Sequence, residues 1–387
     1  MPVIRPGSTI GILGGGQLGR MTAMAARTLG YNVHVLDPSA DCAAAAVVDR
    51  VVAARFDDVD AAEDLARHCD VVTLEIEHIH ADVLAAVATH TPVRPAGIIV
   101  EIIQDRATQK RWLAEHGFPN GPYREACDAS QLADAARELG SLFVKSCRGG
   151  YDGRGQARLS DPSRAADAWR TIGERPAVAE QALDLEAELS VMVARSPSGD
   201  VRVYPPAFNV HERQMLAWSA IPASLPPRVL SDAEEIARGI AEQFALEGLI
   251  AVEMFLLTDG RLLVNELAPR PHNSFHATEV ACSTSQFEQL VRAVCDLPLG
   301  DPRVLRPGAI VNLFGELWAR GDPDFAPALA FPGVRLHLYG KRGARAGRKM
   351  GHLSATGGTA TEALDRVRAA AAAIRMPPAQ HSMIDHS

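Results

Sequence analysis

Short apolar runs alternate with mixed polar and apolar segments along the first hundred residues. The apolar runs predict buried strands over residues 9–13, 32–36 and 71–74. The segment 17–29, between the first two, has helical composition and is followed by a glycine. Strands that alternate with helices are typical of a parallel sheet, so this part is predicted to be a doubly wound α/β unit.

Beyond residue 105 the pattern mixes helices, single strands and a hairpin. Helices are expected over 107–116, 231–244, 285–295 and 361–374. Strands are expected over 142–145, 177–181, 189–194, 201–205, 249–257 and 261–267. Prolines at positions 298, 302 and 307 predict a boundary near residue 300. A small unit over 305–375 is expected after it, and residues 376–387 are expected to form a frayed tail.

Composition then narrows the class of protein. Of 387 residues, 47% are hydrophobic and 22% are charged, and this ordinary mixture excludes disorder over the whole length. The net charge of −8 disfavours nucleic acid or an anionic membrane surface as the main partner. The six cysteines contain no C-x-x-C pair, and no apolar run approaches the roughly 18 residues of a membrane span. These features predict a soluble cytoplasmic protein with reduced thiols.

A first glycine-rich loop, residues 14–19, fits the pattern G-x-G-x-x-G between a strand and a helix. Asp37 lies 23 residues after Gly14, near the position of the acid that binds ribose in dinucleotide-binding domains. Taken alone, the loop indicates an NAD-dependent dehydrogenase. An anion or a substrate near the loop is favoured over a plain strand-to-helix turn, and the plain turn is favoured over NAD.

A second glycine-rich loop, residues 149–156, follows Lys145 and contains Tyr151, Asp152 and Arg154. The backbone N–H groups and cations of such a loop suit a polyphosphate, although no G-K-[ST] ending marks a Walker A loop. The loop is therefore predicted to be a mobile flap over a polyphosphate, in preference to a plain surface turn.

Two glutamates are predicted to face each other across the hairpin. If Asp259 and Gly260 form a two-residue turn, Glu253 lies directly opposite Glu266. Facing carboxylates repel each other, and Mg²⁺ with phosphate oxygens as further ligands would compensate them. A metal site is therefore predicted here, in preference to a solvated pair. In a regular strand, Asn265 would point to the opposite face.

Two polar runs suit an anionic substrate. The first, directly after the predicted metal-binding strand, contains Arg270, His272 and Asn273. The second has five cations within nine residues, 341–349. This second run is either a solvated loop or a site for one phosphate, and the residues alone leave both possibilities open.

In combination, these segments resemble the ATP-grasp superfamily and, within it, the N5-carboxyaminoimidazole ribonucleotide synthases. The resemblance covers residues 8–375. Its most specific segments are GGGQLGRM (14–21), QDR (104–106), GYDGRGQ (150–156), NELAPRPHNS (265–274), SQF (285–287) and GRKMGH (347–352). This sequence departs from the family pattern at Leu74, Ile76, Phe208 and Phe275, and Phe275 stands where glycine is usual.

The resemblance implies three parts: a Rossmann-like preATP-grasp domain over 1–104, an ATP-grasp domain over 105–300 and a C-terminal domain over 301–375. It implies a cytoplasmic homodimer that carboxylates 5-aminoimidazole ribonucleotide (AIR) with ATP and bicarbonate, through carboxyphosphate. The product is N5-carboxyaminoimidazole ribonucleotide, in purine biosynthesis. The expected metal is Mg²⁺, or else Mn²⁺, and no biotin is expected.

The resemblance also assigns roles to single residues. The implied ATP-binding residues are Arg106, Lys145, Gly150, Tyr151, Asp152, Gly153, Arg154, Gly155, Gln156, Glu180, Gln181, Ala182, Leu183, Glu188, His211, Asn265 and Glu266. The implied substrate-binding residues are Gln17, Leu18, Glu75, Tyr151, Arg154, Arg270, His272, Asn273, Ser274, Lys341 and Arg348. The implied catalytic residues are Glu75, Asp152, Arg154, Arg270, His272 and Asn273. The implied metal ligands are Glu253 and Glu266.

Three alternatives to this function stay open from the sequence. They are a related ATP-grasp ligase such as formate-dependent glycinamide ribonucleotide transformylase, the NAD-dependent dehydrogenase, and a nucleotide-binding module without catalysis. The segments PRPHNS and GRKMGH favour the carboxylating enzyme. The joint presence of Lys145, Glu253, Glu266 and Arg270 argues against an inactive module.

Overall fold

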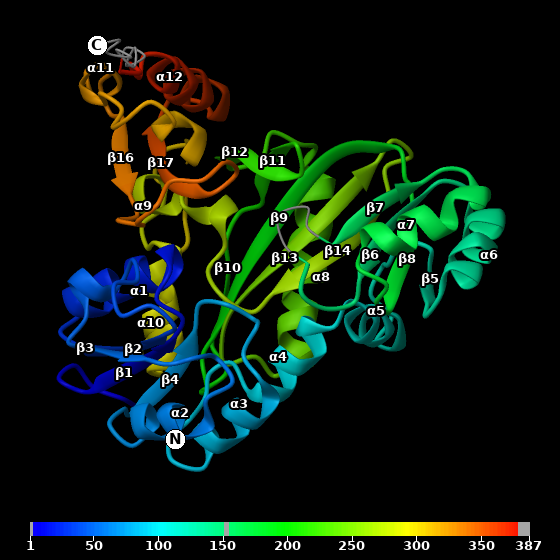
Figure 1. Cartoon of the computed structure of the whole chain (residues 1–387). Coiled ribbons are helices and arrows are strands. Elements are labelled where there is room, and N and C mark those ends of the chain that lie inside the picture. Colours follow the sequence, from blue (N-terminus) through cyan, green and yellow to red (C-terminus); the bar gives the residue numbers. More distant parts are fainter. Residues whose placement is uncertain (1–2, 151–154, 378–387) are drawn as a thin grey trace, which may run out of the picture.

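The structure is a computed structural model that describes residues 3–150 and 155–377. Within these residues the strands form three sheets, two of four strands and one of nine (Figure 1). Part of the predicted flap, namely Tyr151, Asp152, Gly153 and Arg154, lies outside the described residues, as do residues 378–387 of the predicted tail.

The N-terminal sheet contains four parallel strands in the order β3-β2-β1-β4. These strands are β1 (Thr9–Leu13), β2 (Asn32–Asp37), β3 (Arg50–Ala53) and β4 (Val71–Leu74). The helices of this part are α1 (Gln17–Thr28), α2 (Val59–Ala66), α3 (Ala81–Ala88) and α4 (Gly97–Gln104). Ile10, Ile12, Val33 and Val35 are fully buried, as expected for strands of a covered parallel sheet. The predicted parallel α/β unit is confirmed.

A second sheet, called the small sheet below, contains four antiparallel strands in the order β5-β8-β6-β7. Its strands are β5 (Tyr123–Ala126), β6 (Leu142–Ser146), β7 (Gln156–Leu159) and β8 (Ala177–Gln181). Helix α5 (Arg106–Glu115) precedes it, and α6 (Ala129–Leu139) and α7 (Ala165–Thr171) cover it (Figure 1). Leu132 of α6 and Ala168 of α7 pack with Val144 and Ala179 in one apolar cluster, so both helices cover the same face.

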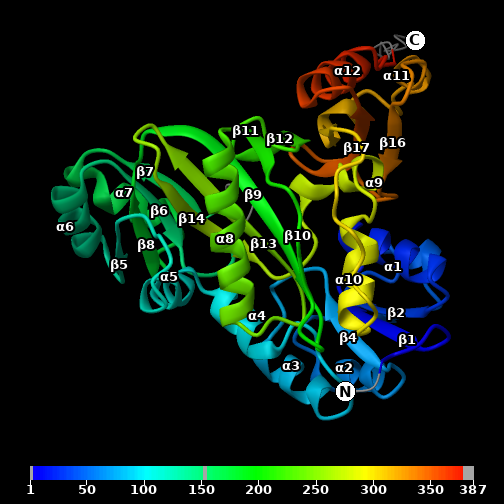
Figure 2. The same ribbon diagram turned by 180° about the vertical axis from the view of Figure 1, so that it is seen from behind.

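The large sheet runs diagonally through the molecule in the order β14-β13-β9-β11-β12-β15-β17-β16, and β10 pairs with β9. Its first six strands in the sequence are β9 (Leu185–Arg195), β10 (Val201–Val203), β11 (Ala207–Glu212), β12 (Met215–Ile221), β13 (Gly248–Leu257) and β14 (Leu262–Ala268). Helix α8 (Pro227–Gln243) lies along its back (Figure 2). There Ala237 and Ile240 pack against Val191 and Val252, so one face of the helix, which was predicted over 231–244, is apolar and buried.

The hairpin β11–β12 is the main element that the sequence pattern missed. Its turn residues, Arg213 and Gln214, have φ values of 50° and 64°. Glycine, asparagine and aspartate are the usual signals for such a turn, because they adopt positive φ at low cost. Arginine and glutamine carry no such signal, and no strand was predicted over residues 207–221.

The C-terminal residues extend the same large sheet. Strand β15 (Gly308–Phe314) pairs with β12, and β17 (Lys349–Thr356) lies between β15 and β16 (Arg335–Leu338). The helices of this part are α11 (Ala326–Leu329) and α12 (Ala360–Ala372). The chain boundary predicted near residue 300 is therefore crossed by strand hydrogen bonds, and the exact domain limits stay a prediction.

The N-terminal part is joined firmly to the large sheet. The buried Arg94 donates from its Nε to Glu247 at 2.8 Å and from its Nη1 to the carbonyl of Val294 at 2.5 Å. Helix α10 (Gln286–Val294) packs between α1 and the large sheet, and both helices contribute to one core cluster (Figure 2). A buried ion pair combined with a shared apolar core favours one fixed arrangement of the two parts.

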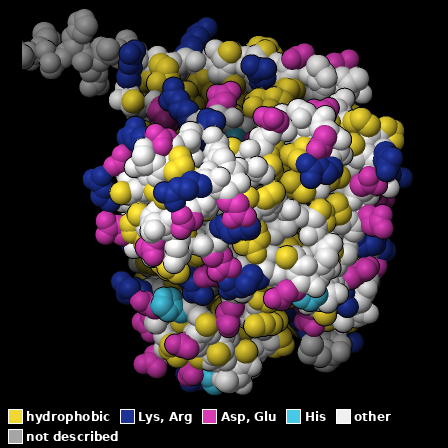
Figure 3. All heavy atoms as spheres, turned by 90° about the vertical axis from the view of Figure 1, so that its right-hand side faces the viewer, with side chains coloured by type: hydrophobic (Ala, Val, Ile, Leu, Met, Phe, Trp, Pro, Cys, Tyr) yellow, Lys and Arg dark blue, Asp and Glu magenta, His cyan; other side chains and the backbone are white. Residues whose placement is uncertain are grey.

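The surface mixes charges of both signs. On the face in Figure 3, basic and acidic side chains are interspersed, with apolar side chains between them. Such mixing on this face lacks the single-sign field that attracts polyanions. Among the described helices, none has both the length and the apolar character that a bilayer crossing requires.

Candidate active site

A cluster of buried charges lies where the small sheet meets strand β14. Lys145 on β6 donates from its Nζ to Glu180 Oε2 at 2.8 Å and to Asn265 Oδ1 at 3.3 Å. Lys110 on α5 places its Nζ 3.3 Å from Glu180 Oε1. Burial alone would raise the pKa of Glu180, but the two ammonium groups outweigh burial and hold it below its usual range.

Arg106, at the start of α5, links this cluster to the second glycine-rich loop. Its Nη2 lies 3.3 Å from Glu266 Oε1 and donates to the carbonyl of Gly150 at 3.1 Å, while Nη1 donates to the carbonyl of Ser146 at 3.3 Å. Three segments distant in the sequence thus meet at one guanidinium. The name charged cluster is used below for Arg106, Lys110, Lys145, Glu180 and Glu266.

The two predicted metal ligands are paired, although not for the reason inferred from the sequence. Glu253 and Glu266 are register partners. The turn, however, has three residues rather than two, because Leu257 donates to the carbonyl of Arg261 and Gly260 has a φ of 86°. The register also shifts beside Glu253, where Asn265 is the extra residue of a β-bulge. The three-residue turn shifts the strand pairing by one residue, and the bulge shifts it back by one, so the predicted pair still forms.

The bulge also corrects the expected direction of Asn265. In a regular strand, neighbouring side chains point to opposite faces. Here Asn265 contacts Lys145 while its neighbour Glu266 contacts Arg106, so both side chains reach the charged cluster. The expectation that Asn265 points away is wrong, because the extra residue bends the strand and re-aims the side chain.

Protein side chains already contact both of the facing glutamates. His272 Nε2 lies 2.8 Å from Glu253 Oε1, and Arg106 contacts Glu266. Burial alone would raise the pKa of Glu253, but His272 outweighs burial and the pKa falls to about 2. The repulsion argument made from the sequence therefore does not by itself require a metal. The carboxylates are ionised hard oxygen donors, however, and such donors suit Mg²⁺.

The turn after β14 is held by a network of uncharged groups. His272 Nδ1 lies 2.8 Å from Ser274 Oγ, which lies 2.8 Å from Ser190 Oγ, and the Asn209 side chain donates to Ser190 at 3.0 Å. Asn273, within this turn, is buried, and both polar atoms of its side chain lack a protein partner. A fixed turn thus presents an amide that is available to a ligand.

Arg270 and Glu77 form a largely buried two-point ion pair, in which each side chain is 18% exposed. Arg270 donates from Nε and Nη2 to the two carboxylate oxygens of Glu77, at 2.6 and 3.0 Å. Burial alone would raise the pKa of Glu77, but the guanidinium outweighs burial and lowers it to about 2. The predicted substrate cation Arg270 is thus tied to the N-terminal part through a carboxylate that the sequence analysis did not assign to the site.

The first glycine-rich loop is occupied by carboxylates of the chain itself. Glu75 accepts hydrogen bonds from the N–H groups of Gly16 at 2.5 Å and Gly19 at 2.7 Å, and Asp37 accepts one from Gly15 at 2.9 Å. A Cβ on Gly16 would lie only 2.4 Å from Glu75. The anion expected at this helix N-terminus is therefore Glu75, and the N–H groups that would bind a dinucleotide are already used.

The C-terminal basic loop lies near this carboxylate. The pKa of Glu75 is raised, because burial has the largest effect on it. Hydrogen bonds from the Gly19 and Gly16 N–H groups and the positive charge of Lys341 lower this pKa in part. Lys341 Nζ donates to the carbonyl of Lys349 at 3.0 Å, and Arg348 donates to the carbonyl of Gly343 at 2.9 Å. The two predicted phosphate-binding cations thus brace their own loop, and Lys341 also acts on Glu75.

Three consecutive stretches of the chain match family models. They match a ribonucleotide synthetase preATP-grasp domain over residues 7–104, an ATP-grasp domain over 111–287 and a phosphoribosylaminoimidazole carboxylase C-terminal domain over 308–366. The chain is 42% identical over 355 residues to the N5-carboxyaminoimidazole ribonucleotide synthase of Brucella melitensis. The aligned residues are 91% of this chain and 97% of that one. This chain belongs to the N5-carboxyaminoimidazole ribonucleotide synthase family.

Further members of the family agree in sequence and in fold. The Bacillus subtilis synthase is 39% identical over 355 residues, which are 91% of this chain and 92% of that one. The ADP complex of an N5-carboxyaminoimidazole ribonucleotide synthetase superposes with a TM-score of 0.89 at 39% identity, over 95% of this chain and 97% of the other. An Aspergillus clavatus synthase solved with ADP and AIR superposes with a TM-score of 0.85 at 31% identity. The match covers 95% of this chain and 98% of the other. The predicted family and three-part fold are confirmed, and the dehydrogenase and transformylase alternatives are not favoured.

Other residues assigned by the family resemblance are placed as follows. His211 Nδ1 lies 2.6 Å from Glu188 Oε2, so two implied ATP contacts meet. The backbone N–H groups of Gln181 and Ala182 donate to the carbonyls of Pro122 and Ser141, at 3.0 and 2.8 Å, so these N–H groups are already used. The side chain of Leu18 is buried in a small apolar cluster with Tyr339 and Phe287. The family resemblance assigns two residues at the start of α1 to substrate binding. Of these, Gln17 has the more accessible side chain.

Three residues of the site were missed by sequence reasoning. Lys110 shares the buried face of α5 with Ala107 and Leu113, and a lysine at this helical spacing was a usable signal. Gln286 holds the backbone of His272 from both sides, with its Oε1 at 2.8 Å and its Nε2 at 2.9 Å. Glu77, the third, carried no local signal for its pairing with Arg270, 193 residues away.

The unusual Phe275 does not point into the site. Its side chain is fully buried and meets the ring of Tyr204 edge-on, with centroids 6.1 Å apart. Phenylalanine is thus accommodated at this glycine position of the synthase family by packing into the core.

Proposed function

We propose that this chain carboxylates AIR to N5-carboxyaminoimidazole ribonucleotide with ATP and bicarbonate, in purine biosynthesis. The observation that carries the proposal is the convergence of Arg106, Lys145 and Glu266 beside the turn that holds His272 and Asn273. Paired buried cations suit the phosphates of ATP, and a fixed polar turn suits the small acceptor molecules.

The proposed reaction has two steps. A bicarbonate oxygen attacks the γ-phosphorus of ATP, the bond to the bridging oxygen breaks, and ADP leaves. The exocyclic amine of AIR then attacks the carbon of carboxyphosphate, or of CO₂ released from it. Phosphate leaves with the electron pair of the broken C–O bond, and the amine loses a proton.

In the first step, the charged cluster binds the phosphates. Lys145 and Arg106 supply positive charge where negative charge is transferred, and their pairing with Glu180 and Glu266 holds them in place before ATP arrives. Asn273 offers an unpartnered buried amide to bicarbonate or to AIR. Tyr151, Asp152 and Arg154 are proposed to act from the flap, outside the described residues.

Mg²⁺ is proposed to bind between Glu253 and Glu266. Both are oxygen donors, and the low pKa of Glu253, about 2, keeps it ionised at neutral pH. The ion would supply charge neutralisation for the transferred phosphoryl group, and Mn²⁺ fits the same ligands. The residues of this chain orient the donors through His272 and Arg106.

AIR is proposed to bind between the first glycine-rich loop and the basic loop. Lys341 and Arg348 would hold its phosphate, and Glu75 and Gln17 would face the rest of the nucleotide. The positive charge of Lys341 near Glu75 supports this placement. A homodimer located in the cytoplasm is proposed from the family resemblance alone, and sedimentation of the purified chain tests the dimer.

The test is a phosphate-release assay with purified protein and ATP. Release that requires both AIR and bicarbonate is expected, together with a carboxylated product. The same assay with formate and glycinamide ribonucleotide as substrates tests for the related ATP-grasp ligase. A fluorescence titration with a nicotinamide cofactor tests for the dehydrogenase. Release with formate, or none with bicarbonate, would contradict the proposal.

A further inference from the structure

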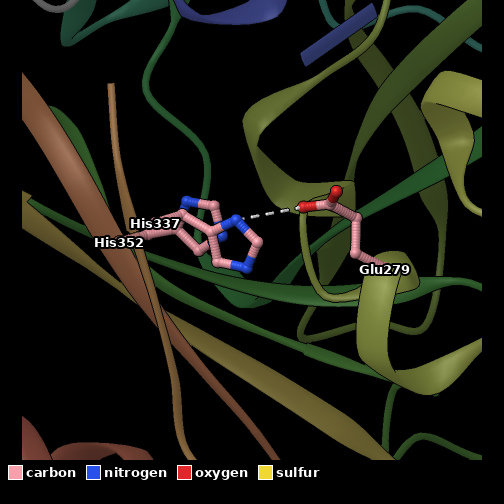
Figure 4. Close-up of side chains that lie close together, drawn as sticks. All are labelled: Glu279, His337 and His352. Atoms are coloured by element: carbon pink, nitrogen blue, oxygen red, sulfur yellow. Dashed lines mark ion pairs between the residues drawn. The ribbon is translucent and has the colours of Figure 1, made fainter. Parts of the chain in front are cut away.

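Three potential metal ligands meet away from the charged cluster. They are Glu279 on α9 (Thr278–Ala281), His337 on β16 and His352 on β17 (Figure 4). One ligand atom from each lies within 4.8 Å of the other two. His337 and His352 are register partners, and their rings stack at 4.5 Å with 7° between the planes. Glu279 Oε2 lies 3.6 Å from His337 Nδ1.

Each of these three side chains has a buried polar atom without a hydrogen-bond partner. The atoms are Glu279 Oε2, His337 Nε2 and His352 Nε2. A buried polar atom without a partner costs about 1–3 kcal/mol, so native proteins seldom gather three in one place. A cation bound between Glu279 and the two imidazoles would supply a missing partner. The proposed carboxylation uses none of these residues.

The surroundings orient one of the imidazoles for a ligand. The Tyr339 hydroxyl lies 2.8 Å from Nδ1 of His352, which leaves Nε2 as the free nitrogen. His276 stacks on His352 at 4.7 Å, and so the ring is held in place. The name histidine cluster is used below for His276, Glu279, His337 and His352.

A pocket of about 390 Å³ is lined by two of these three residues. Its lining includes Glu279 and His337, together with Arg20 and Met24 of α1. Because His337 lies on the edge strand β16 and Glu279 on a short helix at the pocket wall, both are placed to move toward an ion. Ligand atoms around tetrahedral zinc lie roughly 3.3 Å apart, so a contraction of at most about 1.5 Å is required.

We propose that Glu279, His337 and His352 bind one divalent first-row transition-metal ion of the Zn²⁺ class. Two imidazole nitrogens and one carboxylate oxygen suit such an ion better than Mg²⁺, which prefers oxygen ligands throughout. The ion would connect α9, which follows the turn with His272 and Asn273, to the strands that flank the basic loop.

The test uses the full chain, stripped of metal, with Zn²⁺ alone as the probe. Millimolar Mg²⁺ is present throughout to fill the carboxylate site, and bound zinc is counted by equilibrium dialysis. One zinc ion per chain is expected. His337→Asn and Glu279→Gln are each expected to weaken binding by at least about tenfold, while His337→Cys, which keeps a zinc ligand, is expected to restore it.

The matched control is His68→Asn. His68 also has a carboxylate neighbour, Asp64, at 3.8 Å, but on the surface. This variant is expected to bind zinc as the unchanged chain does. The proposal is overturned if the unchanged chain binds no zinc, or if zinc binding survives His337→Asn and Glu279→Gln but is lost in Glu253→Gln. Circular dichroism of each variant without metal verifies that it is folded.

Discussion

The charged cluster and the histidine cluster are both polar and largely buried. They differ in whether their polar atoms have partners within the chain. In the charged cluster, Lys145 and Lys110 share Glu180, and Arg106 meets Glu266. In the histidine cluster, His276, His337 and His352 each have an unpartnered Nε2 atom, and Glu279 has an unpartnered oxygen. The first cluster is complete without a ligand, and the second is not.

This difference separates two ways of preparing a binding site. Paired buried charges hold one another in position, so a charged substrate meets groups that need little rearrangement. Unpartnered neutral imidazoles gain most from a ligand that accepts their lone pairs. Substitutions in the charged cluster should therefore change catalysis, and substitutions in the histidine cluster should change ion binding and stability.

The largest expected effect breaks the charged cluster. Lys145→Met removes the ammonium that joins Glu180 to Asn265. We expect kcat/KM for ATP to fall about a thousandfold, since one preorganised charged contact is worth roughly 4 kcal/mol in the transition state. Arg124→Met, which removes an exposed cation of the same sheet, is the control. A fall of less than tenfold for Lys145→Met would contradict the assignment.

A second substitution tests whether breaking an ion pair outside the charged cluster also has a large effect, here on stability. Glu77→Gln leaves the Arg270 guanidinium buried without its carboxylate. We expect a loss of about 3–5 kcal/mol in the free energy of unfolding, measured in urea. Asp57→Asn, which breaks the exposed pair with Arg55, should change it by less than about 0.5 kcal/mol. Equal losses for both variants would be evidence against a special role of burial.

The same ion pair predicts that the free energy of unfolding decreases at acid pH. The pKa of Glu77 falls from 4.5 to about 2 on folding, because Arg270 outweighs burial. The folded chain therefore binds fewer protons, and the contribution of Glu77 is complete above pH 4.5 and lost as the pH falls toward 2. The change is about 3 kcal/mol. Unfolding measured between pH 2 and 5 should show a shallower pH dependence for Glu77→Gln.

A smaller effect is expected in the basic loop. Arg348→Ala should raise KM for AIR about tenfold and leave KM for ATP nearly unchanged, because a charge-assisted hydrogen bond contributes roughly 1.5–3 kcal/mol. Arg348 also braces the carbonyl of Gly343, so the exposed Arg345→Ala in the same loop is the control. If KM for ATP rises as much as KM for AIR, the loop is structural and does not bind the phosphate.

The smallest expected effect is in the histidine cluster. Tyr339→Phe removes the hydroxyl beside His352 Nδ1 and leaves the ring in place. We expect the metal-free chain to lose about 1 kcal/mol in the free energy of unfolding, with kcat for AIR unchanged. A large fall in kcat would instead connect the histidine cluster to the chemistry.

Local patterns predicted the strands and helices well where apolar runs and turn residues agree. The N-terminal strands and the hairpin β13–β14 are examples. The pairing of Glu253 with Glu266 was correct only because a three-residue turn and the bulge at Asn265 cancel, and neither has a clear sequence signal. The continuation of the large sheet through β15 was not predicted, because strand pairing across a proline-rich boundary depends on tertiary packing.

The site shows the same limit. Motifs located Lys145, Glu266 and His272, because family segments are contiguous in the sequence. They did not locate Glu77, whose partner is 193 residues away, or the meeting of Glu279 with His337 and His352. A histidine or a glutamate alone is most often an ordinary core or surface residue, and only the fold places these three together.

The single large sheet has a consequence for how the two nucleotides affect each other. Strand β14, with Glu266, and strand β17, beside the basic loop, are parts of one hydrogen-bonded sheet. If ATP contacts β14 and the basic loop holds the phosphate of AIR, the paired strands between them keep these two contacts at a fixed separation. We expect the free energy of coupling between the two nucleotides to be small, so that the dissociation constant for AIR is nearly the same with and without ATP.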